Sequence, residues 1–140
     1  MPKLLVAVDG SECSTRAVAH AAKVAAGSPG SQIHLVNVQH PLHGSVTAFV
    51  NAAQIKELHQ EEGMKCLASA RKFLDEQKLP YEHHLFVGDP AETIARYAKE
   101  QGFDEVVIGT RGLSNLSSML MGSVATKIVH HSPVPVTLIK

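Results

Sequence analysis

The sequence has no tryptophan, few aromatic residues and only two cysteines among its 140 residues. Two cysteines are too few for a disulfide framework, so a reducing, cytoplasmic location is the expectation. With so few aromatic side chains, we do not expect a platform on which nucleic-acid bases stack. The 13 basic and 13 acidic side chains cancel, so net charge predicts attraction neither to nucleic acid nor to a membrane surface.

Long apolar runs are also missing. No run approaches the roughly 20 residues that a membrane-spanning helix requires. The first ten residues, MPKLLVAVDG, lack the long apolar core and the small-residue cleavage site of a signal peptide. The length fits one domain, residues 1–140, with a substantial core.

Short apolar runs alternate with segments of helical periodicity. Strands are predicted at 3–9, 32–38, 81–87, 105–108 and 134–139, and helices at about 12–26, 52–77, 90–101 and 124–131. The alternation predicts an α/β fold, a three-layer, doubly wound, five-stranded parallel sheet with helices on both faces. If the strand order is 3-2-1-4-5, the order reverses between the strands that end at Asp9 and Gly109, and ligands bind at such a reversal.

Three local features carry more specific expectations. In the long helix the predicted apolar stripe is Ile55, Leu58, Cys66, Ala70 and Phe73. Gly63 is expected to loosen the packing in the middle of that helix. Asp89 and Glu92 predict a capping box at a helix start, with Pro90 at the first helical position. Pro135 is expected near the start of the last strand, where an edge tolerates it.

Glycines are concentrated in the segment GTRGLSNLSSMLMGSV, which runs from Gly109 to Val124 between a predicted strand and a predicted helix. Glycine lets the backbone approach a ligand closely, and the helix start offers unpaired N–H groups, so this arrangement favours phosphate binding. The segment contains neither the P-loop pattern nor G-x-G-x-x-G. It does contain a GXXG match, but the RNA-binding KH loop of that pattern joins two helices. Each glycine alone fits an ordinary turn; the three together, with a hydroxyl directly after the third, favour phosphate.

The spacing G-x2-G-x9-G-[ST], carried by Gly109, Gly112, Gly122 and Ser123, resembles the nucleotide-binding signature of the universal stress protein family. The likeness is to the ATP-binding branch of that family and runs nearly end to end. It implies the adenine nucleotide alpha hydrolase-like form of the fold and ATP as ligand, with Mg²⁺ or Mn²⁺ held through the phosphates. It also implies a regulatory role in a stress response.

The resemblance also implies a set of site residues. Ala7 matches a position that lines the adenine pocket, and Val38 matches a backbone contact to adenine. Asp9 matches a nucleotide contact, although taken alone a residue at this position fits a turn or a helix cap better. The positions that match ribose and phosphate contacts are Ile108, Gly109, Gly112, Gly122, Ser123 and Val124. Arg111 fits either a phosphate partner or a solvated surface arginine.

The nine histidines do not predict a metal site. His83 and His84 are neighbours on a predicted strand and point to opposite faces. With no cysteine or carboxylate at ligand spacing, no structural zinc is expected. No Ser-His-Asp or Cys-His set can be assembled from sequence neighbours, so no catalytic residue is predicted.

Three functions stay open at this point: a nucleotide-binding regulatory module, a weak Mg²⁺-dependent ATPase, and an interaction protein with an empty site. A phosphorylated receiver fits less well, because it needs an acidic cluster after the first strand, where Asp9 stands alone. The last strand, Val134 to Ile139, is apolar on both faces and lies at the edge in the order 3-2-1-4-5. An apolar edge pairs readily with a second copy, so a homodimer through this strand is expected, as the resemblance also implies.

Overall fold

The structure is a computed structural model that describes residues 2–42, 51–111 and 122–140. Strands and helices alternate along these residues, as the sequence predicts. In chain order they are β1 (Lys3–Ala7), α1 (Glu12–Ala26), β2 (Gln32–Gln39), α3 (Ala52–Glu76), β3 (Glu82–Val87), α4 (Pro90–Glu100), β4 (Glu105–Gly109), α5 (Ser123–His131) and β5 (Val136–Ile139). None of the helices in the described ranges is both long and apolar enough to cross a membrane.

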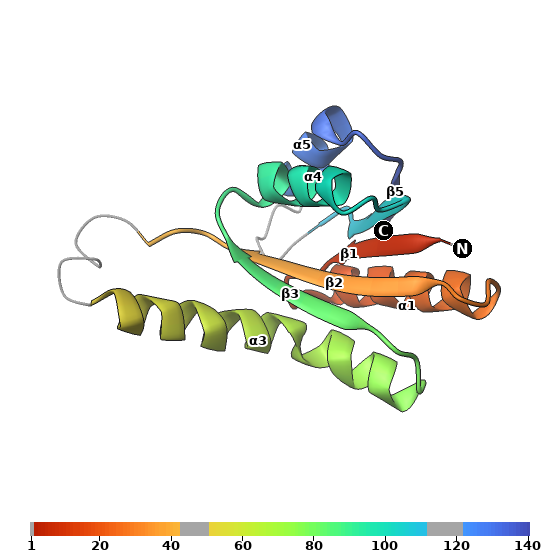
Figure 1. Ribbon diagram of the computed structural model, residues 1–140, viewed down its shortest axis with the longest axis horizontal. Helices are drawn as coiled ribbons and strands as arrows, with labels where there is room; N and C mark the ends of the chain where they lie inside the picture. The colour runs from red at the N-terminus through yellow and green to blue at the C-terminus, as the bar shows by residue number, and fades with distance from the viewer. Residues whose placement is uncertain (1, 43–50, 112–121) are drawn as a thin grey trace.

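The five strands form one parallel sheet in the order β3-β2-β1-β4-β5, which confirms the predicted fold class. β1 lies at the centre, where Val6 pairs with Leu35 of β2 on one side and Val107 of β4 on the other. Helices α1 and α3 cover one face of the sheet, and α4 and α5 cover the other (Figure 1). The strand order therefore reverses between β1 and β4. The chain that leaves the carboxyl end of β1 goes to β2 through α1, and the chain that leaves β4 goes through α5 to β5 on the opposite side.

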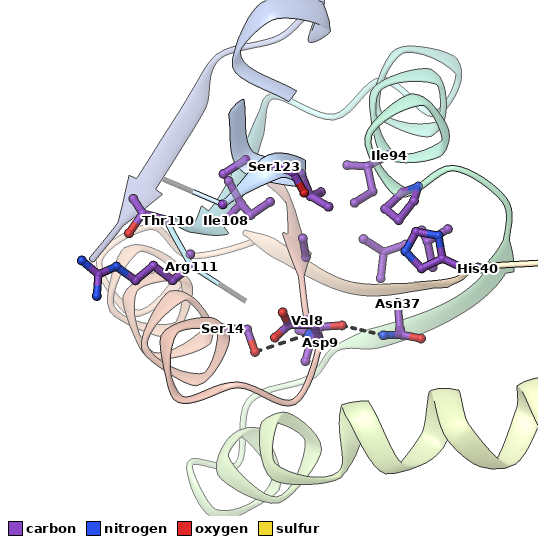
Figure 2. Close-up of a pocket in the computed structure, with 18 residues that line it drawn as sticks. Val8, Asp9, Ser14, Asn37, His40, Ile94, Ile108, Thr110, Arg111 and Ser123 are labelled. Carbon is purple, nitrogen blue, oxygen red and sulfur yellow. Dashed lines mark hydrogen bonds between the residues drawn. The ribbon is translucent and has the colours of Figure 1, made fainter. Parts of the chain in front are cut away.

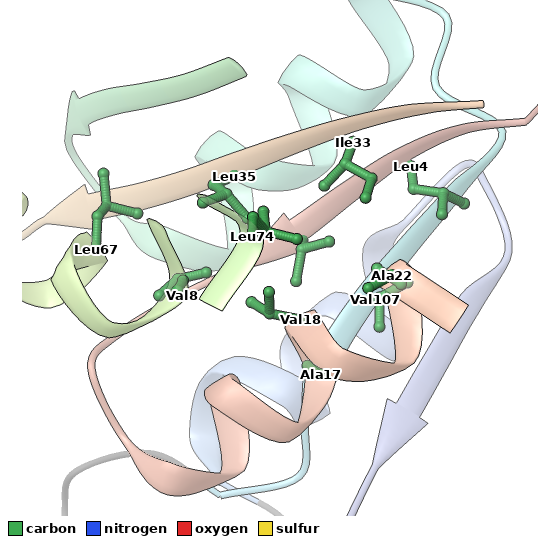
Figure 3. Packing of buried hydrophobic residues seen from close by; sticks show 13 residues of the cluster. Leu4, Val8, Ala17, Val18, Ala22, Ile33, Leu35, Leu67, Leu74 and Val107 are labelled. Carbon is green, nitrogen blue, oxygen red and sulfur yellow. The ribbon is translucent and has the colours of Figure 1, made fainter. Parts of the chain in front are cut away.

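Each face of the sheet has its own apolar core. Alternate residues of β1 serve the two cores, because successive side chains on a strand point to opposite faces. Leu4 and Val6 pack with α1 and α3 (Figure 3), while Leu5 packs with α4 and α5. All three are fully buried. This two-sided burial explains why the strand is almost continuously apolar in the sequence.

Two of the predicted helix N-caps are confirmed, but the predicted capping box of α4 is incomplete. The Ser11 side chain accepts from Ser14 N at the start of α1, and the Asp89 side chain accepts from Glu92 N at the start of α4. The reciprocal bond predicted from Glu92 is not found among the hydrogen bonds of the described residues. A complete capping box occurs instead at α3, where Asn51 and Gln54 bond each other's backbone.

The predicted stripe of α3 is confirmed in part. Ala70 is buried and Phe73 packs against the core, whereas Leu58 is 39% exposed. The fully buried residues Gly63, Leu67 and Leu74 were not in the predicted stripe. The predicted weak point, Gly63, is a point of close contact. A Cβ there would lie 2.5 Å from Leu85 Cδ2 on β3. The missing side chain lets the helix approach the sheet.

The ends of the strands also differ from the predicted ranges. β1 stops at Ala7, two residues before Asp9, while β4 continues to Gly109. β5 begins at Val136, so Pro135 precedes the strand, and its carbonyl accepts from Val106 N. Because Pro135 lies outside the strand, it does not remove a donor from within β5.

Gly109 supplies a test of how closely β4 packs on α1. A Cβ at Gly109 would lie 2.7 Å from Cys13 Sγ and 3.0 Å from the Cys13 carbonyl carbon. Backbone cannot move aside as a flexible side chain can, so we expect Gly109→Ala to lower the free energy of unfolding by about 1–3 kcal/mol. Urea denaturation measures the change.

Gly27→Ala is the matched control for this substitution. Gly27 has φ −85° at the end of α1, and the nearest neighbour of an added Cβ is 3.8 Å away. We expect this variant to be as stable as the wild type or slightly more stable. Equal unfolding midpoints for the two variants would show that the close contact at Gly109 carries no energetic weight.

Candidate functional site

A cavity of about 380 Å³ opens at the carboxyl edge of the sheet, where the strand order reverses. The ends of β1, β2 and β4 surround it together with the first turns of α4 and α5. Its lining residues are Ala7, Val8, Asp9, Ser14, Val36, Asn37, Val38, His40, Pro90, Ile94, Ile108, Gly109, Thr110, Arg111, Gly122, Ser123, Val124 and Ala125. Figure 2 shows Ser123 and Ile94 on one side of this space and Asp9 and Asn37 on the opposite side.

Every predicted site residue that the structure describes lines this cavity. These residues are Ala7, Asp9, Val38, Ile108, Gly109, Arg111, Gly122, Ser123 and Val124. Gly112 lies outside the described residues. The sheet brings together positions up to 117 residues apart in the chain, from Ala7 to Val124, because β1 and β4 are hydrogen-bonded neighbours.

One side of the cavity is apolar. Val36 and Val38 reach it from β2, Ile108 from β4, and Pro90 and Ile94 from the first turn and a half of α4. The α4 residues were missed by sequence reasoning, which treated that segment only as a helix start. The sequence signal for these residues was the helix start at Asp89-Pro90, because it places the first turn of α4 directly after the end of β3. This side suits a flat, weakly polar group.

Asp9 is both a turn residue and a cavity residue. Its Oδ1 accepts from Ser11 N at 2.9 Å, and its own N–H lies 3.4 Å from Ser14 Oγ (Figure 2). Gly10 follows with φ +88°, a conformation that favours glycine. The Asp9–Ser11 turn thus holds the carboxylate at the cavity wall with one oxygen already bonded. The other oxygen has no hydrogen-bond partner among the described residues and is available to a ligand.

The middle of α3 packs closely against the Asp9–Ser11 turn. A Cβ on Gly10 would lie 3.4 Å from Cys66 Cα. Burial raises the pKa of the Cys66 thiol, and the charge of Asp9 acts in the same direction. The thiol is therefore neutral at physiological pH, and Cys66 is a packing residue.

Asn37 was also missed by sequence reasoning. It is 4% exposed, and its Nδ2 donates to Val8 O at 2.8 Å, just beyond the end of β1. Gln39 Nε2 donates to Asn37 Oδ1 at 2.7 Å. The Asn37 amide continues the connection between β1 and β2 after the β1 strand has ended, and so fixes the wall that carries Asp9. A buried polar residue in an apolar strand was the signal for it.

The start of α5 faces the cavity without a side-chain cap. Gly122 is the N-cap residue, with φ −70° and ψ 163°, and no side-chain cap bond is made there. Gly122 N donates to Thr110 O, which ties this helix start to the end of β4. The first N–H groups of a helix have no partner within the helix, so they are available to an anion. The exposed Ser123 adds a hydroxyl at the same place.

The backbone conformation of Gly122 is one that any residue adopts. The glycine is therefore not required by φ. Arg111 is exposed, and in Figure 2 its side chain extends away from the middle of the cavity. Of the two alternatives for Arg111, this orientation favours a solvated surface arginine.

The arrangement suits a ligand with a flat apolar part at one end and an anionic group at the other. The apolar wall and the start of α5 provide those two ends, and Asp9 lies between β1 and α1 as a hydrogen-bond acceptor. A helix start and a carboxylate in one cavity favour different parts of such a ligand, because the first attracts negative charge and the second repels it.

Comparison with known proteins agrees with this fold. The model of the universal stress protein family matches residues 1–140. Universal stress protein YxiE of Bacillus subtilis (strain 168) is 33% identical over 145 aligned residues, which cover 99% of this chain and 98% of YxiE. A universal stress protein solved in complex with cAMP superposes with a TM-score of 0.74 at 26% identity, covering 99% of this chain and 97% of that one. The universal stress protein from Archaeoglobus fulgidus solved in complex with dAMP gives a TM-score of 0.67 at 25% identity, covering 100% and 98%. The chain belongs to the universal stress protein family.

Proposed function

We propose that the cavity binds ATP and that the protein is a nucleotide-dependent regulatory module of a cytoplasmic stress response. The observation that carries the proposal is the continuity of one cavity from an apolar wall to the uncapped start of α5. Its volume of about 380 Å³ falls in the range of small-molecule sites, roughly 300–1,000 Å³. Two family members solved with cAMP and dAMP support an adenine nucleotide as the ligand class.

The three parts of the nucleotide each have a matching part of the cavity. Adenine fits the apolar wall at Val38, beside Ala7 at the end of β1, and Ile108 borders the space for the ribose. The ribose hydroxyls can donate hydrogen bonds to the second carboxylate oxygen of Asp9. The phosphates fit the N–H groups of Ser123 and Val124 beside Gly122, whose own N–H is bonded to Thr110 O, and the helix dipole favours negative charge there.

The phosphates would also hold the divalent cation. Mg²⁺ keeps several waters and binds through phosphates and one or two carboxylates, so a cage made of protein side chains is not needed. Mn²⁺ accepts the same oxygen ligands. The bound cation neutralises phosphate charge, while the side chains of the cavity orient the nucleotide.

Calorimetric titration with ATP tests the proposal through Gly122→Val. The backbone at Gly122 accepts valine, since φ is −70°, so we expect a folded protein. The added side chain would fill the space beside the helix start, and we expect ATP binding to be abolished. Ser123→Ala removes one hydrogen bond to a charged group and should weaken binding about ten- to a hundredfold.

Ser69→Ala is the control for the serine variant, because Ser69 is an exposed α3 residue away from the cavity. It should bind ATP as the wild type does. Unchanged affinity in folded Gly122→Val would show that phosphate is not bound at the start of α5. If the wild type binds no adenine nucleotide, and none is recovered from freshly purified protein, the protein is an interaction module with an empty site. Single-turnover hydrolysis of bound ATP separates the regulatory module from a weak ATPase.

Asp9→Asn separates the two roles of Asp9. Asparagine keeps an oxygen that accepts from Ser11 N, while the negative charge is lost. We expect nearly unchanged thermal stability without ligand and about ten- to a hundredfold weaker nucleotide binding. Asp9→Ala removes both functions and should lower the melting temperature as well. Wild-type affinity in Asp9→Asn would show that Asp9 serves only the turn.

The edge strand β5 supports a homodimer. Among the described strands β5 pairs with β4 alone. Leu138 is 37% exposed, whereas Val136 packs against the core under α4 and α5. Antiparallel pairing of β5 with a second copy would cover Leu138 and satisfy the edge. The sequence predicted that residues Val134 to Ile139 pair with a second copy. In the structure the strand is Val136–Ile139, so the proposed interface is limited to these residues.

Leu138→Lys tests the homodimer by placing a charge in the proposed interface. We expect the wild type to have the mass of two 15.0 kDa chains by light scattering behind size exclusion at micromolar concentration, and the variant to shift towards monomer. Leu58→Lys is the matched control, since Leu58 is 39% exposed on α3, away from β5. A wild-type protein with the mass of one chain would contradict the dimer.

A further inference from the structure

A second group of chemically active side chains lies on β2 and β3, apart from the cavity. Glu82 on β3 pairs with His34 on β2, and His84 is two residues beyond Glu82. Residues two apart on a strand share a face, so the three side chains meet on one side of the sheet. That side is covered by α4, whose Tyr97 ring packs 5.2 Å from the His84 ring, centre to centre.

The three potential ligand atoms converge. His34 Nδ1 lies 2.9 Å from His84 Nε2 and 3.2 Å from Glu82 Oε2, and all three atoms lie within 4.8 Å of one another. On a tetrahedral zinc ion with Zn–N bonds of about 2.0–2.1 Å, neighbouring ligand atoms are roughly 3.3 Å apart. The third distance, between His84 Nε2 and the Glu82 carboxylate, is below 4.8 Å, and the exposed Glu82 side chain can rotate to close around an ion.

Hydrogen bonding sets the form of His34. Its Nε2 lies 3.3 Å from Gln32 Oε1, an amide oxygen that only accepts, so Nε2 carries the proton. The lone pair of Nδ1 then accepts a hydrogen bond from His84 Nε2, 2.9 Å away. The Glu82 carboxylate lies 3.2 Å from the same nitrogen. A metal ion bound at Nδ1 would take the place of the His84 proton and would lie beside this carboxylate.

We propose that His34, Glu82 and His84 bind one Zn²⁺ ion, through His34 Nδ1, His84 Nε2 and a carboxylate oxygen of Glu82. Two imidazoles and a carboxylate form a ligand set that zinc accepts in proteins, whereas Mg²⁺ and Ca²⁺ prefer oxygen ligands alone. The His34 side chain is 8% exposed and Glu82 is 69% exposed. The ion therefore enters from the Glu82 side, where water completes the tetrahedron.

The surroundings fit the outer contacts that zinc ligands usually make. Gln32 accepts the Nε2 proton of His34, as the second nitrogen of a metal-binding histidine normally requires. The Tyr97 hydroxyl lies 3.4 Å from both ring nitrogens of His84, so it is near enough to accept from Nδ1 when Nε2 binds the ion. Phe103 holds the His34 ring edge-on at 4.9 Å between ring centres.

The sequence led us to expect no structural zinc, because we found no carboxylate or cysteine at ligand spacing from the histidines. Glu82 is in fact two residues from His84, but the third ligand, His34, is 48 residues before Glu82 and reaches it only through strand pairing. The observation that His83 and His84 point to opposite faces still holds, and it provides a control. His83 is exposed on the other face of β3.

Calorimetric titration of EDTA-treated, nucleotide-free protein with Zn²⁺ tests the proposal. We expect one ion per chain for the wild type. We expect Glu82→Gln and His84→Gln each to weaken binding at least about ten- to a hundredfold, the effect known for outer-contact residues alone. His83→Gln should bind as the wild type does. Both Glu82 and His84 lie outside the fully buried core, so these variants should fold, and their melting temperatures without metal verify it.

Imidazole nitrogen NMR provides the second measurement. Zinc should shift the signals of His34 Nδ1 and His84 Nε2 and leave those of His83 unchanged. Three results would overturn the site: no binding of Zn²⁺ by the wild type at micromolar concentration, unchanged affinity in both Glu82→Gln and His84→Gln, or an equal loss in His83→Gln. The last result would show that surface histidines hold the ion.

Discussion

The burial of β1 on both of its faces is the constraint on which the rest of the structure depends. Leu4, Leu5 and Val6 are fully removed from water, which requires helices above and below the sheet and a strand on each side of β1. With β2 on one side and β4 on the other, the crossovers leave in different directions. The space between them at the carboxyl edge cannot be filled by either crossover, and the cavity lies there.

The walls of that cavity are held by contacts that continue the sheet past its last strand residues. Asn37 bonds to Val8 O beyond the end of β1, and Gly122 N bonds to Thr110 O beyond the end of β4. Both contacts are made by groups that border the cavity. The position of Asp9 and the position of the α5 start are thus tied to the same rigid sheet, so a ligand that bridges them meets a prearranged site with little ordering cost.

β2 connects this cavity to the cluster of His34, Glu82 and His84. Val36 lines the cavity at the carboxyl side of β2, and His34 lies two residues earlier on the same face. α4 covers both regions: Ile94 faces the cavity, and Tyr97, one turn later, packs on His84. The two regions share elements but use different residues, so each can be altered without removing a side chain from the other.

Much of this protein follows from local sequence. The alternation of apolar runs and helical segments determined the strands, the helices and the layered fold, because period and length are local properties. The glycine spacing, which is also a local property, predicted that Gly109, Gly122 and Ser123 belong to the site. Tertiary structure alone decided how closely α3 packs on the sheet, because the close contact at Gly63 is with Leu85 of β3. It alone placed Asn37 and Ile94 in the cavity wall and His34 beside Glu82, since contacts between strands and helices depend on register and packing, which no single segment contains.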